Sequence, residues 1–344
     1  MKLEYLSQTT LIEDVCSPID FDSIIEHNKT ITMFDRNIDE VSKEISINQI
    51  TPTNNLRLLI SGKLSSADAI KLSHLSKKYK KTRLVFSTKL EDFDSLVHFK
   101  ELYGIQVRDF SPDHFTLLEK IPKSLKDISI DFSSRKSFSI EPLKIFKDLK
   151  RLQIQGKVKD LNVISNFSKL EVADLGYMHI DNFSFLKNLK YLTRLCLRHG
   201  GVFDYSELEN LSTLESIYIW KVRGLNDLNW LEDLANLKDI EIGALAQIHQ
   251  LPSFEGIQKL EFIKLEQLKS LEKIDEISES ESVKKIHISK MNDLDISTYE
   301  SFIGHPNLIE ITSGYSAKKK CKTITELLNL PVVTYEPFYI SADF

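Results

Sequence analysis

Four residues in the middle of the chain have the types and spacing that suit recognition of another protein. Tyr218 and Trp220 are two positions apart, so both side chains would point to the same side of an extended strand. Arg194 and Arg198 precede them. Tryptophan, tyrosine and arginine dominate protein-binding hot spots because they bury much area and also carry polar groups. The chemistry that these residues predict is non-covalent recognition.

Five further residues belong to the same predicted surface. Asp239 and Glu241 follow the aromatic pair, Phe262 and Lys264 come next, and Asp174 precedes the arginines. Together the nine residues form a candidate partner-binding site centred on Trp220. An alternative stays open, in which an arginine stacks on the indole and pairs with neighbouring acids only to cover the strands.

Motifs for catalysis are absent from the sequence. It contains no GxxxxGK[ST] phosphate loop and no GxGxxG, GxSxG, HExxH or CxxC pattern, and its nine histidines are scattered. We therefore expect no enzyme activity, no catalytic residues, no metal and no cofactor. Cys196 and Trp230 are interpreted as packing residues, and His199 and His287 as ordinary surface histidines.

A repeated hexad must position the candidate site. Its pattern is LxxLxL, with Ile or Val allowed for Leu, and its copies start at positions 125, 149, 170, 192, 214, 237, 260, 283 and 308, which are 21 to 25 residues apart. The copy at 170 is weak and the one at 308 is partial. Each hexad ends in an apolar–polar alternation, which predicts a strand with one buried face.

Between hexads, apolar residues recur at every third position. One such series is Leu225, Leu228, Leu231, Leu234 and Leu237. A period of three suits 3₁₀ turns, in which residues i and i+3 are eclipsed. The sequence thus predicts repeats of a short strand, a turn and a tight helical return, which bury their apolar faces by stacking on one another.

A fixed period of this length makes the chain resemble the leucine-rich repeat family, and most closely its bacterial short-repeat, internalin-like type of about 22 residues. The resemblance covers at least Leu102 to Leu308, and Leu84-Phe86 and Leu58-Ile60 look like further strands. It implies an α/β solenoid with parallel strands on a concave face and 3₁₀ turns or short helices on a convex face. The outward strand positions, those of the candidate site included, should then face solvent.

The chain departs from the family at one position. The family places Asn three residues after the last hexad residue, where this sequence has Lys157, Met178, Gly200, Val222, Leu245, Leu268 and Met291. We expect apolar packing to replace the asparagine ladder.

Atypical segments should cap the repeats. The predicted domains are an N-terminal cap (1–55), the solenoid (56–315) and a C-terminal cap (316–344). Residues 66–80 read as a helix that begins at Ser66, with Ala67, Ile70, Leu72 and Leu75 on its apolar side. Residues 323–330 read as a second helix, which Pro331 stops, and residues 332–335 as a closing strand.

Composition indicates which kind of partner and which cellular compartment are favoured. The formal net charge is −5 with both signs well mixed, which disfavours a nucleic-acid partner. A signal peptide and a long apolar span are not visible, which favours a cytoplasmic protein with no membrane contact. We expect a protein partner of unknown identity. An immunity or inhibitor protein that occludes a toxin, or a delivered effector, stays open, as does the oligomeric state.

Overall fold

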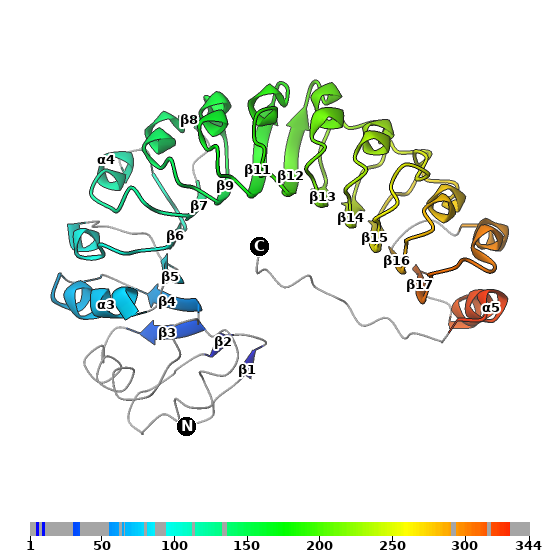
Figure 1. Ribbon diagram of the computed structural model, residues 1–344, viewed down its shortest axis with the longest axis horizontal. Helices are drawn as coiled ribbons and strands as arrows, with labels where there is room; N and C mark the ends of the chain where they lie inside the picture. Colours follow the sequence, from blue (N-terminus) through cyan, green and yellow to red (C-terminus); the bar gives the residue numbers. More distant parts are fainter. Residues whose placement is uncertain are drawn as a thin grey trace. The chain divides into compact units, whose positions relative to one another are not determined.

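The computed structural model describes residues 5–6, 9–10, 30–34, 55–61, 64, 66–78, 81–86, 94–111, 114–132, 136–289, 294–314 and 318–330. The chain divides into two compact units. Figure 1 labels helices and strands of both. Unit 1 comprises Met1–Met178 with Asn188–Tyr191, and unit 2 comprises His179–Lys187 with Leu192–Phe344.

Unit 1 is built on parallel strands. Its strands are β1 (Tyr5–Leu6), β2 (Thr9–Thr10), β3 (Thr30–Phe34), β4 (Asn55–Ser61), β5 (Lys81–Phe86), β6 (Gly104–Val107), β7 (Asp127–Asp131), β9 (Arg151–Gln155) and β11 (Val172–Ile180). β1 pairs with β2 in antiparallel fashion, and every later pair of neighbours is parallel. β8 (Phe138–Ser139) and β10 (Val158–Lys159) form a separate parallel pair. Parallel pairing therefore reaches into the segment expected to be an N-terminal cap.

Helical segments return the chain between the strands of unit 1. They are α3 (Ser66–Lys78), η1 (Asp94–His98), α4 (Phe115–Leu118), η3 (Glu141–Ile145) and η4 (Leu161–Asn166).

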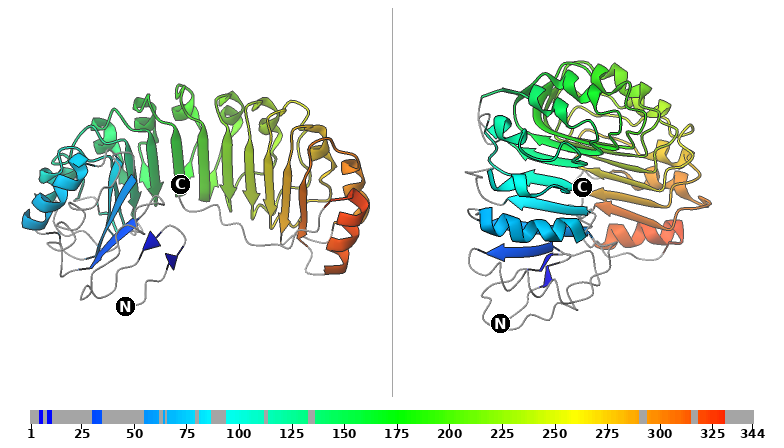
Figure 2. Two further views of the ribbon diagram at one scale, coloured as in Figure 1. Left: turned by 60° about the horizontal axis from the view of Figure 1, so that its bottom comes forward. Right: turned by 60° about the vertical axis from the view of Figure 1, so that its left-hand side comes forward.

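Unit 2 repeats the plan with six parallel strands (Figure 2). They are β12 (Arg194–Val202), β13 (Ser216–Trp220), β14 (Asp239–Gly243), β15 (Phe262–Glu266), β16 (Lys285–Ser289) and β17 (Glu310–Gly314). The helical segments are η5 (Ser184–Leu186), η6 (Ser206–Asn210), η7 (Asn229–Asp233), η8 (Asp275–Glu279), η9 (Ile296–Phe302) and α5 (Lys318–Leu328).

The strand register confirms the predicted repeat. Leu195 lies opposite Ile217, and Ile217 lies opposite Ile240, so equivalent hexad positions are neighbours in the sheet. All three side chains are at most 1% exposed. The core is thus a stack of apolar rows, one residue from each repeat.

The period-three segment between β13 and β14 forms the expected 3₁₀ turns. The N–H groups of Leu231, Leu234 and Leu237 each donate to the carbonyl three residues earlier, at 2.9–3.0 Å. The same leucines are buried. Residues i and i+3 are eclipsed in a 3₁₀ turn. The spacing that allows these backbone hydrogen bonds therefore also places the apolar side chains in one row that faces the core.

A residue with positive φ lies two positions after the last hexad residue in most repeats. Gly156 occupies this position with φ 130°, and five non-glycine residues occupy it at φ 54–62°: Tyr177, His199, Lys221, Ala244 and Gln267. The next position, where the family has Asn, holds buried Met178, Val222, Leu245 and Leu268. The expected replacement of the asparagine ladder by apolar packing is confirmed at these four positions.

The end helices differ in detail from prediction. In α3, Ala67 and Ile70 are exposed, which contradicts their expected apolar side. The buried stripe is Ala69, Leu72, Ser73 and Ser76 at i, i+3, i+4 and i+7, where small serines allow close packing. α5 begins five residues before the predicted 323 and packs against η9 and β17, and the expected strand at 332–335 lies outside the described residues.

The left-handed turns predict opposite effects for two alanine-to-glycine changes. Ala244 has φ 54°, where a Cβ costs about 1–2 kcal/mol that glycine avoids. Glycine loses about 0.5–1 kcal/mol through the entropy of the unfolded chain, so Ala244→Gly should raise the free energy of unfolding by about 0.5–1 kcal/mol. Exposed Ala235 does not have a positive φ, so Ala235→Gly should lower the free energy of unfolding. Urea unfolding checks both, and equal signs would contradict the strained turn.

Candidate functional site

The outward positions of the strands in unit 2 form one surface, which we call the open face. It comprises Arg194, Cys196 and Arg198 on β12, Ser216, Tyr218 and Trp220 on β13, Asp239, Glu241 and Gly243 on β14, Phe262, Lys264 and Glu266 on β15, Lys285, His287 and Ser289 on β16, and Glu310 and Thr312 on β17. Eight of the nine predicted site residues lie on it. Asp174 lies on β11, in unit 1.

The register places the predicted residues in three lines across the strands of unit 2. One line runs Arg198, Trp220, Gly243 and Glu266, and the next runs Cys196, Tyr218, Glu241 and Lys264. The third runs Arg194, Ser216, Asp239 and Phe262. The neighbours that the hexad predicted are therefore neighbours in the sheet.

Solvent exposure of the outward positions was predicted wrongly for several residues. Asp174 is 1% exposed, Glu241 6% and Cys196 2%. Parallel strands are only about 4.8 Å apart, so long side chains on adjacent strands cover shorter ones between them. The burial of Cys196 agrees with a packing role, and Trp230, 4% exposed in η7, is a packing residue as predicted.

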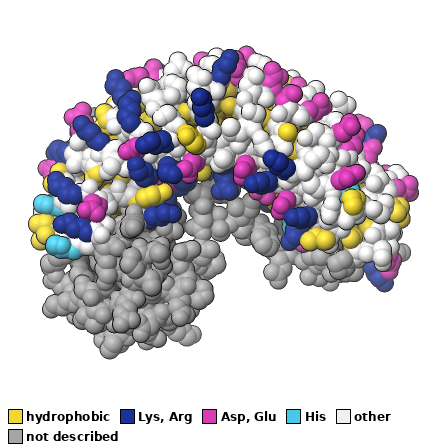
Figure 3. All heavy atoms as spheres, viewed as in Figure 1, with side chains coloured by type: hydrophobic (Ala, Val, Ile, Leu, Met, Phe, Trp, Pro, Cys, Tyr) yellow, Lys and Arg dark blue, Asp and Glu magenta, His cyan; other side chains and the backbone are white. Residues whose placement is uncertain are grey.

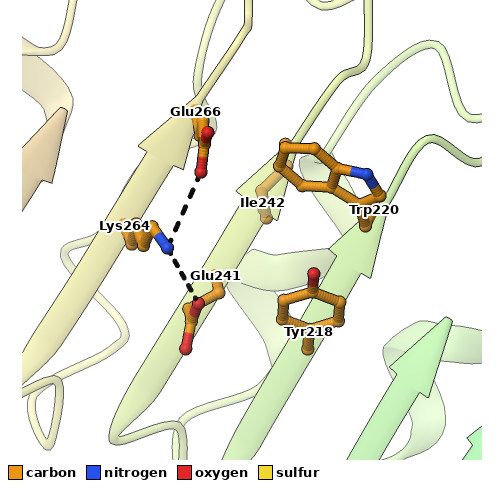
Figure 4. A pocket seen from close by; sticks show the side chains of 7 residues that line it. Tyr218, Trp220, Glu241, Ile242, Lys264 and Glu266 are labelled. Atoms are coloured by element: carbon orange, nitrogen blue, oxygen red, sulfur yellow. Dashed lines mark ion pairs between the residues drawn. The ribbon is translucent and has the colours of Figure 1, made fainter. Parts of the chain in front are cut away.

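A small hollow lies within the open face (Figure 4). Its volume is about 210 Å³, open solvent included. Its lining consists of Tyr218, Trp220, Glu241, Ile242, Gly243, Lys264 and Glu266. The space in it that water-sized molecules can occupy is only about 30 Å³, far below the roughly 300–1,000 Å³ that is usual for small-molecule pockets.

Gly243 fixes the place of the Trp220 side chain. The two residues are opposite each other on β13 and β14. A Cβ at Gly243 would lie 2.3 Å from Cζ3 of Trp220 and 2.9 Å from the carbonyl oxygen of Glu266. The indole therefore lies directly over the backbone of β14, in a space that only glycine leaves open.

Lys264 lies between two carboxylates of the hollow (Figure 4). Its Nζ is 3.7 Å from Oε2 of Glu241 and 3.6 Å from Oε2 of Glu266. Both distances exceed hydrogen-bond length, so the ammonium is shared between the acids by Coulombic attraction. Two of the three charged residues in the lining are therefore acids.

Burial perturbs two titratable groups of the site. It raises the pKa of Glu241 to about 7, with Lys264 opposing the shift and Asp239 adding to it. Burial, followed by the nearby charge of Glu241, raises the pKa of Tyr218 to about 12. The Tyr218 hydroxyl thus stays protonated at neutral pH and can donate a hydrogen bond.

The remaining predicted residues flank the hollow. Burial raises the pKa of Asp239 although Arg194 opposes this. The Phe262 ring meets His287 edge to face at 5.1 Å between centroids, and Nε2 of His287 is 2.6 Å from Oε1 of Glu310. His287 is thus part of an internal contact and is not a simple surface residue.

Three lining residues were absent from the predicted site: Ile242, Gly243 and Glu266. Gly243 and Glu266 occupy the same line as Trp220, one and two strands away. The hexad register could have found them, because it fixes which residues flank Trp220. Their roles depend on side-chain direction and burial, which the repeat does not encode.

A second polar cluster lies in unit 1 and is internal. Asp127, 1% exposed, forms ion pairs with Arg83 and with Arg151, the latter at 3.4 Å. Arg83 reaches Asp127 across β6, where a Cβ at Gly104 would lie 2.7 Å from Cβ of Asp127. Asp127 was expected to face solvent, but it is buried and forms ion pairs with two arginine side chains.

Charges of both signs are interspersed over the surface visible in Figure 3. Within the described ranges, no three His, Cys, Asp or Glu residues gather in a way that would hold a metal ion. No helix in the part of the chain that the structure describes has the length and apolar character for crossing a membrane.

Several solved structures are similar to this chain. An internalin from Listeria monocytogenes is 18% identical, with a TM-score of 0.51, and the match covers 80% of this chain and 86% of that one. A leucine-rich repeat protein of Leptospira interrogans is 16% identical (TM-score 0.41, 79% and 88% covered). A chain of the mouse RP105/MD-1 complex is 12% identical (TM-score 0.47, 75% and 47% covered). No protein-family model and no curated protein sequence matches.

The strand register, the 3₁₀ returns and the likeness to the internalin establish the fold class. The chain is a leucine-rich repeat solenoid of the α/β class, and its solved structural neighbours include internalins.

The arginine cluster of unit 1 predicts a large stability loss. Asp127→Ala would leave the half-buried Arg83 and Arg151 side by side without the buried carboxylate that they share, so the free energy of unfolding should fall by about 2–3 kcal/mol. Asp131→Ala on the same strand removes an exposed carboxylate and should change it by about 0.5 kcal/mol or less. Chemical denaturation of both variants checks the difference. A loss no greater than that of the control would contradict the buried cluster.

Burial of Glu241 predicts a pH-dependent stability difference. The folded-state pKa, about 7, lies above the ordinary value of 4.5, so the folded state binds the proton more tightly. The resulting cost of charging Glu241 is absent below pH 4.5 and complete above pH 7. The gap in unfolding free energy between Glu241→Gln and the parent should therefore grow in favour of the variant by about 2 kcal/mol from pH 5 to pH 8. Urea titrations at both pH values measure it, and a constant gap would refute the shift.

Proposed function

We propose that the chain is a non-enzymatic protein-binding module that holds its partner on the open face of unit 2, around Trp220 and Tyr218. The observation that carries this proposal is the half-buried aromatic pair, which lines a small hollow between charged residues. Such a hollow can receive a protruding side chain of a partner, while the surrounding side chains exclude water from the contact.

The sheet supports this function by its rigidity. Every strand of the open face is paired on the strand register described above, so the side chains are positioned before a partner arrives. Preorganisation reduces the entropy that binding would otherwise remove. Gly243 adds to it, since the indole already occupies the space over β14.

The mixed charges of the open face suit a partner with a specific charge pattern. Arginines flank the aromatic pair on β12, and acids flank it on β14. Complementary charges mainly speed encounter and reject wrong partners, and the aromatic contact supplies most of the affinity. This division of roles supports a defined protein partner over nonspecific adhesion.

More specific functions than protein binding, and the cellular location, are inferred from the sequence alone. An immunity or inhibitor protein that occludes a toxin and a delivered effector both stay predictions, as does a cytoplasmic location. A toxin-like neighbouring gene would favour the first, and a secretion cluster would favour the second.

Truncation of Trp220 tests the proposed function. Partners are captured from the source cell with the full chain, purified, and titrated against the parent and Trp220→Ala. The variant should fold normally, because the indole is half-buried on the open face, and should bind at least about 2 kcal/mol more weakly, roughly thirtyfold in Kd.

Phe203→Ala is the matched control. Phe203 is an aromatic residue of unit 2 that is 77% exposed and lies just beyond β12, off the open face. Its truncation should leave the Kd unchanged. A captured protein whose affinity falls with Phe203→Ala but not with Trp220→Ala would place binding elsewhere and overturn the proposed function.

A further inference from the structure

One edge of the open face has a local excess of basic residues. Residues 194–203 and 216–224, which are β12, β13 and the residues directly after them, contain four arginines or lysines and no aspartate or glutamate, although the whole chain has a formal net charge of −5. Four residues lie together where β13 ends, and we call them the basic edge: Arg198, His199, Lys221 and Arg223.

The two basic side chains that follow β13 converge on one turn of β12. Nε of Arg223 donates to the carbonyl oxygen of Gly200 at 3.3 Å. Burial lowers the pKa of His199, and the nearby charges of Lys221 and Arg198 lower it further. Because a like charge disfavours protonation of the ring only at short range, the Lys221 ammonium also lies near this turn.

The charges of Lys221 and Arg223 have no counter-charge in the part of the chain that the structure describes. Both side chains are exposed, and no described carboxylate lies within ion-pair distance of either. Other lysines of unit 2 differ, since Lys238 and Lys284 pair with glutamates at 2.8 Å and 3.1 Å. A partner that supplies carboxylates to the basic edge would therefore not have to displace an acid described here.

The backbone that carries the two cations is held in place. Lys221 has φ 55° and is followed by buried Val222. Gly224 follows Arg223 with φ 89°, and a Cβ at Gly224 would lie 2.0 Å from the carbonyl oxygen of Val202. The turn after β13 is thus packed directly on the end of β12, so a partner meets two cations whose attachment points are already fixed.

We propose that the basic edge binds an acidic segment of the partner protein, whose carboxylates pair with Lys221 and Arg223 while an adjoining part of the partner covers Trp220. This inference rests on the proposed function and names the chemistry that the partner presents. Lys221 directly follows Trp220, and Arg198 lies opposite Trp220 in the sheet, so the basic edge is continuous with the aromatic pair. Carboxylates suit these cations because a guanidinium can bind one through two parallel hydrogen bonds and an ammonium donates in several directions.

A nucleic acid fits the basic edge less well. The next strands of the open face carry Asp239, Glu241 and Glu266, so a strand of phosphates that runs along the face would pass from cations to carboxylates. A nucleic-acid surface usually has a clustered basic excess over a much larger area. A short acidic segment needs only the two exposed cations.

A peptide tests the inference without the partner. The chain contains two tryptophans, so 5-fluorotryptophan labelling of the full chain gives two ¹⁹F signals, which Trp220→Phe assigns. Acetyl-hexaglutamate amide and its uncharged analogue acetyl-hexaglutamine amide are titrated at pH 7.5. At about 0.02 M salt, hexaglutamate should shift the Trp220 signal saturably and bind at least about tenfold more tightly than hexaglutamine, and about 0.5 M salt should remove the difference.

The His199 ring supplies a second readout. Carboxylates bound at the basic edge oppose the charges that hold down the pKa of this ring, so saturating hexaglutamate should raise that pKa. Proton NMR of the histidine rings against pH measures the change, and His199→Gln assigns the signal. A surface that merely attracts the peptide to another part of the chain would leave the pKa of His199 unchanged.

Paired variants locate the binding. The double variant Lys221→Glu with Arg223→Glu should abolish hexaglutamate binding, and the neutral double variant Lys221→Gln with Arg223→Gln should show an intermediate loss, a graded response that unfolding would not give. The matched control is Lys187→Glu with Lys259→Glu, which changes the charge equally at two exposed lysines in the helical returns of unit 2. It should weaken binding at most about threefold, because distant charges are partly screened.

Three results would overturn the inference: equal binding of the two peptides, unchanged hexaglutamate binding in the variant with glutamates at 221 and 223, or equally tight binding of hexathymidylate, which would indicate a nucleic-acid surface. Failure of the proposed function gives a different result. A partner whose affinity depends on Trp220 but not on Lys221 and Arg223 would refute the acidic segment alone. A partner whose affinity is independent of Trp220 would refute the proposed function, whatever the peptides show.

Discussion

In-register stacking of one repeat on the next is the constraint on which the other features of each unit depend. A single repeat has a short strand and a 3₁₀ turn, and neither can bury its leucines alone. Pairing of Leu195 with Ile217 and of Ile217 with Ile240 solves this for the core. The same pairing sets Cys196, Tyr218 and Glu241 side by side on the other face. The line of residues at the candidate site is therefore a consequence of the core.

Stacking also imposes backbone strain at the turns and steric crowding between strands, and the chain accommodates the two in different ways. The chain must turn sharply after each strand, and it does so with left-handed residues such as Lys221 and Ala244, although each carries a Cβ. Such strain persists because the buried apolar residues that follow, Val222 and Leu245, hold the turn in place. Where a large side chain lies across the neighbouring strand, the cost is avoided with glycine. Gly243 under Trp220 and Gly104 beside Asp127 are the two cases.

The sequence predicts the parts of this structure that depend on periodicity. Hexad spacing gives the strands, the register and the neighbours of Trp220, because period and phase determine which residues pair. It does not give the burial of polar outward residues. Asp127, Asp174 and Glu241 were expected to face solvent and are nearly inaccessible, since that outcome depends on how the side chains of adjacent repeats cover one another.

The same limit applies to helices and to charge. The buried stripe of α3 includes Ser73 and Ser76, whose hydroxyls donate to backbone carbonyls three residues earlier, and Ile70 is exposed. Glu266 was not predicted as a site residue, because the sequence alone does not show where the side chain of an isolated acid points. Its importance follows from the strand pairing, which places it two strands from Trp220 and beside Lys264.

The burial of Glu241 on the open face costs stability when its carboxyl group is charged. Glu241 is costly to ionise where it lies, and Lys264 relieves that cost only in part, at a distance too long for a hydrogen bond. A fold selected for stability alone would be expected to bring the ammonium closer or to place an apolar residue at this position.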